Sequence, residues 1–298
     1  MSTCFEFVRI KTRDGVELCG MMSKGTGFEN RAIIHVHGLA GNFYEQRFVD
    51  NLASAAESSD CRILLFNNRG HDYFSDAIKE IDGRRETVSK GGAHERLADA
   101  AYDIEAAIAF VKARGLDDVI ITAHSTGCVK LVRYVLDTIN HPKITGVVFI
   151  SPSDDVGLQA ENAGAEFQKT IDAAKHMVQE GRADEIMPDG TFFYPIDAQA
   201  YLDLFDPHGF GNVFDLTNRG RGLEMLSNWS IPTLIVLGSE DIAVTDTEKK
   251  RAAEEILQAL PEDSAHRSVV IEGAAHDYAG YESKLQVIIE EWIANLLA

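Results

Sequence analysis

Apolar and polar positions along the chain predict strands and helices that alternate. Short runs of apolar, mostly β-branched residues predict strands buried on both faces, and stretches of helical period lie between them. Strands that alternate with helices at this spacing indicate βαβ units, so we expect an α/β fold with a mainly parallel sheet flanked by helices. The predicted strands are Phe5–Lys11, Val16–Met21, Ala32–Val36, Ile63–Phe66, Val119–Ile121, Gly146–Ile150, Thr233–Leu237 and Ser268–Ile271.

The predicted connections between these strands differ in kind. The first two strands are joined through Asp14-Gly15, a hairpin signal, and should form an antiparallel edge. A long polar loop is expected after the fourth strand, up to Gly92. The clearest helix is His94–Arg114, with an apolar face, acidic early turns and a basic last turn. Further elements are helices at Phe43–Ala56, directly after Gly127, at Thr247–Leu260 and from Glu282 onward, and a loop at Gly25-Thr26-Gly27.

The alternation of strands and helices breaks after the sixth strand. Helical patterns occur there at Ala165–Glu180 and Asp197–Leu204, and no strand pattern is visible. We therefore expect residues 1–152 and 229–298 to form one α/β core, interrupted by a helical insertion at residues 153–228. The insertion is rich in aromatic side chains, namely Phe167, Phe192, Phe193, Tyr194, Tyr201, Phe205, Phe210 and Phe214.

Composition narrows the class of function. The 298 residues are 45% hydrophobic, enough for one large domain, and the formal net charge of -19 argues against nucleic acid or an anionic membrane surface as the main partner. No apolar run reaches the roughly 18 residues that span a bilayer, and no secretory signal is visible after Met1. The cysteines show no close pairing, so we expect free, buried thiols and a cytoplasmic protein. They are Cys4, Cys19, Cys61 and Cys128.

The stretch around Ser125 carries the first chemical signal. The run Ala123-His124-Ser125-Thr126-Gly127 joins a predicted strand to a predicted helix, as in a nucleophile elbow. Such a turn holds the serine in a strained backbone conformation and exposes its hydroxyl beyond the carboxyl end of the strand. Small residues two positions before and after the serine let the strand and helix approach, and Ala123 stands where glycine is usual. A plain strand-to-helix turn is the alternative interpretation.

A serine nucleophile needs a base, and the base needs a group that orients it. In an open parallel sheet these groups come from loops at the carboxyl ends of other strands. Asp241 and His276 follow the last two predicted strands, so the predicted triad is Ser125, Asp241 and His276. Glu240 and Asp246 are rival acids, and a turn or surface role is the alternative for the triad members. Packing, capping or solvated roles are expected for the histidines at His71, His94, His208 and His266.

The tetrahedral intermediate of acyl transfer needs hydrogen-bond donors for its oxyanion. One backbone N–H is expected from Thr126, the residue after the nucleophile, and the second from Leu39, in the loop after the third strand. Gly38 allows an unusual backbone in that loop, and His37 is expected to brace it rather than to do chemistry. The candidate pocket residues are His37, Gly38, Ala40, His124, Phe193 and Tyr194.

With these residues in place, the chain resembles a member of the α/β-hydrolase superfamily over essentially its whole length. The resemblance implies a Ser-His-Asp hydrolase that acts through an acyl-enzyme, with residues 153–228 as a helical cap over the active site. The run His124-Ser125-Thr126-Gly127-Cys128 is also similar to the branch that includes fungal siderophore esterases. The matching pieces are His37-Gly38, Asn68-Arg69-Gly70-His71, the run around Ser125, Asp241 and His276.

These features favour a carboxylesterase-like serine hydrolase that acts on an ester with a small or medium acyl or aromatic part. Lactone or amide hydrolysis and acyl transfer on the same triad are alternatives, as is a receptor-like ligand-binding protein on a hydrolase scaffold. No cofactor is expected, and no metal, because no helical His-x-x-x-His or clustered Cys/His ligands occur. Arg69 could hold a substrate carboxylate, although pinning its loop is the favoured role. The aromatic insertion could also serve as a homodimer surface.

Overall fold

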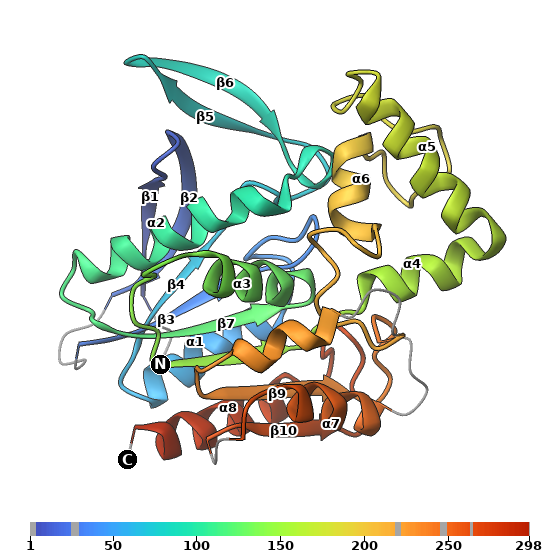
Figure 1. The fold of residues 1–298 in the computed structure, drawn as a ribbon. Coiled ribbons are helices and arrows are strands. Elements are labelled where there is room, and N and C mark those ends of the chain that lie inside the picture. Colours follow the sequence, from blue (N-terminus) through green and yellow to red (C-terminus); the bar gives the residue numbers. More distant parts are fainter. Residues whose placement is uncertain (1–3, 25–29, 218–221, 245–248, 263–264, 298) are drawn as a thin grey trace.

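The computed structural model describes residues 4–24, 30–217, 222–244, 249–262 and 265–297. In this part of the chain ten strands form one sheet, and helices cover both of its faces (Figure 1). The strand order is β10-β9-β8-β7-β3-β4-β2-β5-β6, and β1 pairs with β2. The strands are β1 (Phe5–Lys11), β2 (Val16–Ser23), β3 (Arg31–Val36), β4 (Arg62–Phe66), β5 (Ser75–Ile81), β6 (Arg84–Lys90), β7 (Asp118–His124), β8 (Gly146–Ile150), β9 (Thr233–Gly238) and β10 (Arg267–Ile271).

The pairings confirm the mainly parallel sheet. Neighbours from β4 through β3, β7, β8 and β9 to β10 are all parallel. Strands of this kind have helices on both faces, which explains their nearly continuous apolar runs. On β7, Ile120 packs in one core cluster, whereas Val119 and Ile121 pack in the other. The β1–β2 pair is antiparallel, as Asp14-Gly15 predicts, and β2 is also antiparallel to β4.

Two groups of helices sandwich the sheet. Helices α1 (Phe48–Ser58) and α8 (Glu282–Leu296) contribute to one core cluster on one face. Helices α2 (Ala100–Lys112), α3 (Thr126–Asp137) and α7 (Lys249–Ala259) contribute to the cluster on the other face. The two clusters pack the helices against both faces of the sheet, and the sheet in turn positions the loops at the ends of its strands.

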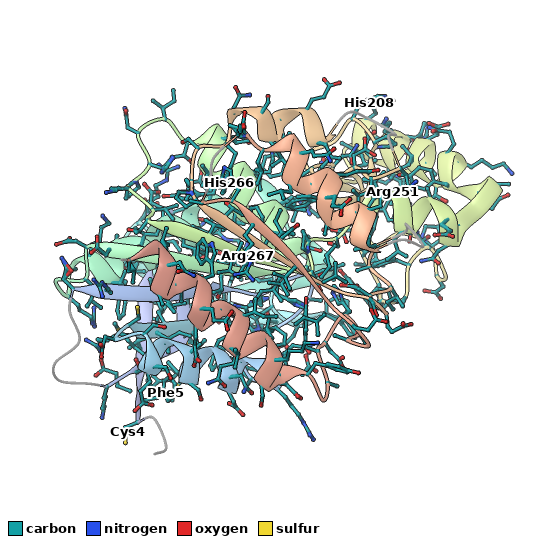
Figure 2. All side chains as sticks on the ribbon, turned by 90° about the horizontal axis from the view of Figure 1, so that it is seen from below. Cys4, Phe5, His208, Arg251, His266 and Arg267 are labelled. Carbon is teal, nitrogen blue, oxygen red and sulfur yellow. The ribbon has the colours of Figure 1, made fainter. Side chains whose placement is uncertain are left out.

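The carboxyl ends of the parallel strands bring separate loops together. The loops after β3, β7, β9 and β10 lie at the same edge of the sheet, because these strands run in the same direction. His266 and Arg267 mark the opposite, amino end of β10 (Figure 2). Residues that follow the carboxyl ends are therefore the ones that can meet in a site.

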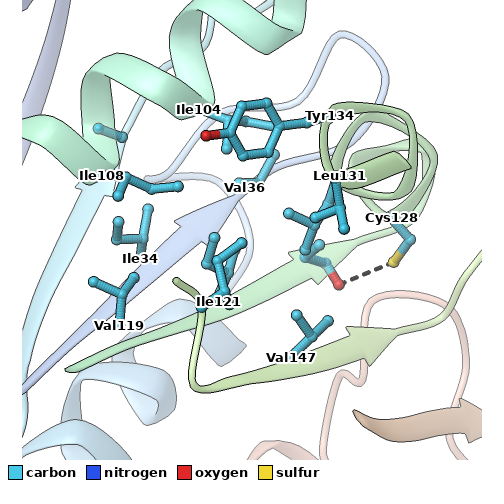
Figure 3. Close-up of a cluster of buried hydrophobic side chains, with 14 of the residues drawn as sticks. Ile34, Val36, Ile104, Ile108, Val119, Ile121, Cys128, Leu131, Tyr134 and Val147 are labelled. Carbon is cyan, nitrogen blue, oxygen red and sulfur yellow. Dashed lines mark hydrogen bonds between the residues drawn. The ribbon is translucent and has the colours of Figure 1, made fainter. Parts of the chain in front are cut away.

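The four cysteines are free thiols, as predicted. Cys128 lies in the cluster between α3 and the sheet, where its Sγ–H donates to the Ala123 carbonyl at 3.1 Å (Figure 3). Burial raises the pKa of the Cys128 thiol well above its ordinary value. Cys61 is also buried, whereas Cys4 and Cys19 are exposed, which corrects the expected burial of these two. Cys128 is therefore a packing residue next to the turn that holds Ser125.

The stretch between Ser75 and Lys90 corrects the sequence analysis, which predicts a loop there. It forms the β5–β6 hairpin, which extends the sheet through the pairing of β5 with β2. Most side chains of both strands are exposed or only half-buried, so no apolar alternation marks them as strands. The turn contains Asp82 and Gly83 with φ values of 49° and 75°. An Asp-Gly pair is itself a hairpin signal, so Asp82-Gly83 is the local sign of this turn.

The helix predicted over His94–Arg114 is a second correction. Its regular part, α2, begins at Ala100, and short 3-10 turns precede it. Glu95 in this stretch forms an ion pair with the buried Lys130 at 2.6 Å. This contact between residues far apart in the sequence lies in the stretch before α2, and the local pattern does not reveal it. Helix α1 also begins later than predicted.

The described chain between β8 and β9 contains helices joined by irregular stretches. Its apolar side chains form a core cluster of their own, which also includes Ala40 and Leu97 from outside the segment. The β-pairing among the described residues of this segment is a single isolated bridge between Ile186 and Asp197. The division of the chain at residues 153 and 228 stays a prediction. The elements are α4 (Asp155–Ala163), α5 (Phe167–Gln179), α6 (Ala198–Phe205) and 3-10 turns at Gly164–Glu166 and Gly222–Asn228.

Some predictions fall on other parts of the chain. The loop at Gly25-Thr26-Gly27, the first residues of the helix Thr247–Leu260 and the rival acid Asp246 lie outside the described residues. Within the described ranges, no helix combines the length and the apolar character needed to cross a membrane.

Candidate active site

Ser125 lies in the tight turn between β7 and α3. Its φ of 56° and ψ of -132° are rare for a residue other than glycine, so the backbone is strained at this position. Two hydrogen bonds stabilise this backbone conformation. The Ser125 N–H donates to the Ile150 carbonyl at 3.0 Å, and the Ser125 carbonyl accepts from the Cys128 N–H at 2.9 Å. A Cβ at Gly127 would lie 2.5 Å from the Val36 carbonyl oxygen, which explains the glycine. These are the backbone features that a nucleophile elbow requires.

Asp241 and His276 meet across the loops that follow β9 and β10. His276 Nδ1 lies 2.8 Å from Asp241 Oδ1, so the Nδ1–H donates to the carboxylate and Nε2 is left to act as a base. The same carboxylate oxygen accepts from the Ala243 N–H at 2.9 Å, which fixes its position. Asp241 is wholly buried, whereas 26% of the His276 side chain is exposed. The acid therefore lies behind the base, away from solvent.

Each partner shifts the titration of the other. Burial would raise the pKa of Asp241, but the hydrogen bond and charge of His276 outweigh it and hold this pKa below its ordinary value. Burial would lower the pKa of His276, but the hydrogen bond and charge of Asp241 raise this pKa above its ordinary value. The pair is thus poised to stabilise an imidazolium at His276.

A cavity of about 490 Å³ brings together residues that lie far apart in the sequence. Ser125 and His276 both line it, and so do Leu39 and Thr126. A side chain at Gly38 would place its Cβ 2.8 Å from the Ser125 Cβ, so the backbone before Leu39 packs against the serine. Thr126 is the first residue of α3, where backbone N–H groups have no partner within the helix. Both N–H groups are thus close to Ser125, and their role toward an oxyanion stays a prediction.

A buried polar network braces the loop after β3. The Asn68 N–H donates to His37 Nε2 at 3.0 Å, so Nδ1 carries the proton and donates to the Gly38 carbonyl at 3.0 Å. Burial holds the pKa of His37 well below its ordinary value, so the ring is neutral. Lys130 Nζ lies 3.5 Å from the Gly38 carbonyl and 2.6 Å from Glu95 Oε1. Sequence analysis missed Lys130 and Glu95, although a lysine within the apolar run of α3 is a signal of such a pair.

His124 supports the base instead of facing the cavity. Its Nε2 lies 3.0 Å from the His276 carbonyl oxygen, which requires the proton to be on Nε2, and its ring centroid is 4.7 Å from that of His276. Burial lowers the pKa of His124 to about 3, so the ring is neutral. His124 therefore packs beneath the loop that carries the base.

The candidate pocket residues divide into two groups. Phe193 lines the cavity, and 71% of its side chain is exposed. The described residues that line the cavity do not include His37, Gly38, Ala40, His124 or Tyr194, which corrects these predictions. His37 and His124 are turned inward by the hydrogen bonds given above. Ala40 joins the apolar cluster of the segment between β8 and β9.

Tyr194 directly follows Phe193, which does line the cavity. Its ring stacks on Tyr73 at 4.7 Å between centroids, and its side chain is buried. The ring of Phe193 lies 4.9 Å from that of Tyr194, yet Phe193 is largely exposed and lines the cavity, whereas Tyr194 is buried. Residue spacing could not reveal this in an irregular loop.

The rival residues occupy other positions. Arg69 is buried and ion-pairs with Asp103, Asp14 and Asp99, so it pins its loop, as favoured from the sequence. The side chain of Glu240 is exposed and bonded to Ser239. The other histidines lie apart from the Asp241–His276 pair: His71 pairs with Asp72, His94 pairs with Asp197, His208 is exposed, and His266 lies at the amino end of β10 (Figure 2).

Helix α4 contributes a group of side chains that the sequence analysis missed. Asp155, Leu158, Gln159 and Asn162 line the cavity. The sequence predicts helices at Ala165–Glu180 and Asp197–Leu204 but none at Asp155–Ala163, so it gives these residues no common helical face. Among the described residues, no group of three or more His, Cys, Asp or Glu side chains is arranged to hold a metal ion.

Comparisons with known proteins give one family and several structures. The family model described as "Protein of unknown function (DUF1749)" matches residues 92–297. No curated protein matches the chain. An esterase from Pyrococcus furiosus is similar in structure, with 15% sequence identity, a TM-score of 0.64, and coverage of 100% of this chain and 92% of that one.

Two further solved structures are similar over almost their whole length. The siderophore hydrolase EstB from Aspergillus fumigatus has 14% identity and a TM-score of 0.69, with 98% of each chain covered. Est1E from Butyrivibrio proteoclasticus, solved with ferulic acid bound, has 14% identity and a TM-score of 0.62, with 97% of this chain and 98% of that chain covered. At these identities the likeness extends to the fold alone.

Proposed function

The chain belongs to the family described as "Protein of unknown function (DUF1749)" and has the α/β-hydrolase fold, as the sequence predicts, and from this premise we propose that it is a serine hydrolase. The observation that carries the proposal is the hydrogen bond between His276 and the buried Asp241, on the cavity that Ser125 also lines. A base oriented by a buried acid beside a serine in a strained turn is the arrangement that acyl transfer requires.

The proposed reaction is the hydrolysis of a carboxylic ester through an acyl-enzyme. Ser125 Oγ attacks the ester carbonyl while its proton passes to His276 Nε2, and Asp241 stabilises the imidazolium that forms. The backbone N–H groups of Leu39 and Thr126 bind the oxyanion. The proton then moves to the leaving alkoxide, and a water molecule, activated by the same histidine, releases the acid and restores the serine.

The segment at residues 153–228 is proposed to be the cap that shapes the cavity. Phe192, Phe193 and Phe205 from this segment line the cavity together with Ser125, which supports the proposal. Apolar walls of this kind favour an acyl or aromatic substrate part and limit the access of water. A cytoplasmic location and a homodimer through the cap aromatics belong to the same proposal, the former supported by the free cysteines.

A spectrophotometric assay tests the proposed activity. The wild-type protein should hydrolyse p-nitrophenyl butyrate, and Ser125→Ala should abolish turnover while the thermal unfolding profile stays unchanged. The matched control is His208→Ala, which alters an exposed histidine and should leave the rate unchanged. An unchanged rate in Ser125→Ala would overturn the proposal.

A further inference from the structure

One wall of the cavity is formed by a single face of α4. Asp155, Leu158, Gln159 and Asn162 line the cavity, and their spacing of three and four residues places them on one side of the helix. Three of these side chains are polar. Apart from Ser125, Thr126 and His276, the rest of the lining is aromatic or aliphatic. The α4 face is therefore the part of the cavity that can recognise a polar group of a bound molecule.

Asp155 is held beside the proposed nucleophile. Thr126 directly follows Ser125, and its Oγ1–H donates to Asp155 Oδ2 at 2.9 Å. A carboxylate accepts several hydrogen bonds, so Asp155 keeps acceptor capacity toward the cavity. Among the described residues that line the cavity, Asp155 is the single carboxylate, and neither a lysine nor an arginine accompanies it.

Gln159, one turn further along α4, presents an acceptor as well. Its Nε2 donates to the Tyr201 hydroxyl at 3.2 Å and to the Thr191 carbonyl at 3.4 Å. Because these bonds use the two amide hydrogens, Oε1 is the atom that Gln159 has left for a bound molecule. The wall thus combines a carboxylate with a carbonyl-type oxygen, a set that suits a group rich in N–H donors.

The charge of Asp155 has consequences for the proposed chemistry. Burial raises the pKa of Asp155 to about 6, so the carboxylate is still mostly ionised at neutral pH. Its place in the first turn of α4 also favours the ionised form. A negative charge close to Thr126 opposes the negative charge that develops on the oxyanion. A cation bound at Asp155 would cancel this repulsion.

We propose that the cavity selects acyl esters that carry a protonated primary amine, with Asp155 as the acceptor of the ammonium group. The inference rests on the proposed serine hydrolase function and adds the substrate class. The ammonium donates to the Asp155 carboxylate and to Gln159 Oε1, and the hydrocarbon part of the substrate packs on the phenylalanines of the cavity. If Asp155 served only to hold Thr126, its loss would affect charged and neutral esters alike.

The test uses two p-nitrophenyl esters of equal size. The β-alanine ester carries an ammonium group where the butyrate ester carries a methyl group. At pH 7.5, and after correction for the uncatalysed rates, the wild-type kcat/KM should be about ten-fold higher for the β-alanine ester, as expected for a charge-assisted hydrogen bond. Asp155→Asn keeps the shape and an acceptor for Thr126, and it should bring the ratio of the two kcat/KM values down from about ten to about one.

Thr126→Val is the matched variant for the structural role. It removes the hydroxyl that bonds to Asp155 but leaves the carboxylate and the backbone N–H, so the preference for the β-alanine ester should survive. If Asp155→Asn does not fold, Asp155→Ser removes the same negative charge and replaces it in the test. Thermal unfolding shows whether each variant is folded.

The outcomes separate the inference from the function on which it rests. A wild-type protein that hydrolyses both esters equally, or an Asp155→Asn variant that loses both activities in equal measure, overturns the inference and leaves the serine hydrolase function standing. If the wild-type protein hydrolyses neither ester and a fluorophosphonate does not label Ser125, the proposed function fails and the inference fails with it.

Discussion

His276 Nδ1 lies 2.8 Å from Asp241 Oδ1, and the Asp241 side chain has no exposed surface. The carboxylate fixes one tautomer of the imidazole, with Nε2 unprotonated and available as a base. Since Asp241 is buried, the charge that forms on His276 during the reaction is stabilised with little screening by solvent. The relationship explains why the acid and base must be considered as one unit.

Asp241→Asn should therefore lower kcat strongly. The amide places N–H or C=O against the imidazole and no longer selects the required tautomer, so we expect a loss of about 10³–10⁴-fold. Ester hydrolysis under saturating substrate is the measurement. Glu240→Gln, one residue earlier and exposed, is the matched control and should retain most of the activity. Equal losses in both variants would contradict the assignment of Asp241.

The pH dependence of kcat/KM should report the same pair. Burial opposes the charged imidazolium, but Asp241 outweighs it and raises the pKa of His276 above 6.5. The base works only when neutral, so the rate should fall as the pH drops through a midpoint above 6.5. Asp155 also favours the imidazolium, so Asp155→Asn should move the midpoint to lower pH. A wild-type midpoint below 6.5 would contradict this electrostatic account.

Gly38→Ala should impair catalysis more than binding. A Cβ at this position would lie 2.8 Å from the Ser125 Cβ and 3.0 Å from the His124 carbonyl oxygen, so the loop that carries Leu39 must shift. We expect kcat to fall by about 10²-fold, the effect of losing one oxyanion donor. Gly41→Ala is the control in the same loop, because its Cβ would have no neighbour closer than 3.4 Å. Equal kcat values in the two variants would contradict the expected shift.

Lys130→Met should destabilise the protein. Lys130 and Glu95 are both buried and lie 2.6 Å apart, so removal of the lysine leaves an unpaired buried carboxylate. We expect the free energy of unfolding to fall by about 3–5 kcal/mol, and the double variant with Glu95→Met to recover part of it. Urea denaturation is the measurement.

The exposed pair between Lys169 and Glu166 supplies the control for this prediction. Its atoms lie 2.7 Å apart, but both side chains are largely exposed. Lys169→Met should therefore change the free energy of unfolding by less than about 1 kcal/mol. If the free energy of unfolding falls by a similar amount in both lysine variants, the buried pair does not stabilise the protein more than the exposed pair.

The sequence predicted the parallel sheet and the places of the candidate site because both depend on local patterns. Buried parallel strands are continuous apolar runs, and their direction places Asp241 and His276 at the edge where Ser125 lies. In the structure the loops after β9 and β10 bring His276 Nδ1 to 2.8 Å from Asp241 Oδ1, while the catalytic roles of these residues stay a prediction. A single sequence is thus enough to predict which residues follow the carboxyl ends of the parallel strands.

Contacts between distant segments could not be predicted in this way. The β5–β6 hairpin has few buried side chains, so its strands lack the apolar signal. Glu95 lies before the start of α2 and pairs with Lys130, which is 35 residues further along the chain. Asp155 lines the cavity where its carboxylate accepts from the Thr126 hydroxyl, and the inward turn of His124 depends on His276 in another loop. Each of these outcomes is decided by tertiary packing, which a residue pattern does not contain.

The most direct test of the central claim is the intact mass of the protein after incubation with a small fluorophosphonate, with the modified peptide mapped. The account predicts stoichiometric modification at Ser125 in the wild-type protein and in the control His208→Ala. It predicts no modification in His276→Ala, because Ser125 then has no base. A folded wild-type protein that remains unmodified, or a His276→Ala variant that is modified as fast as wild type, would contradict the claim that Ser125 is an activated nucleophile.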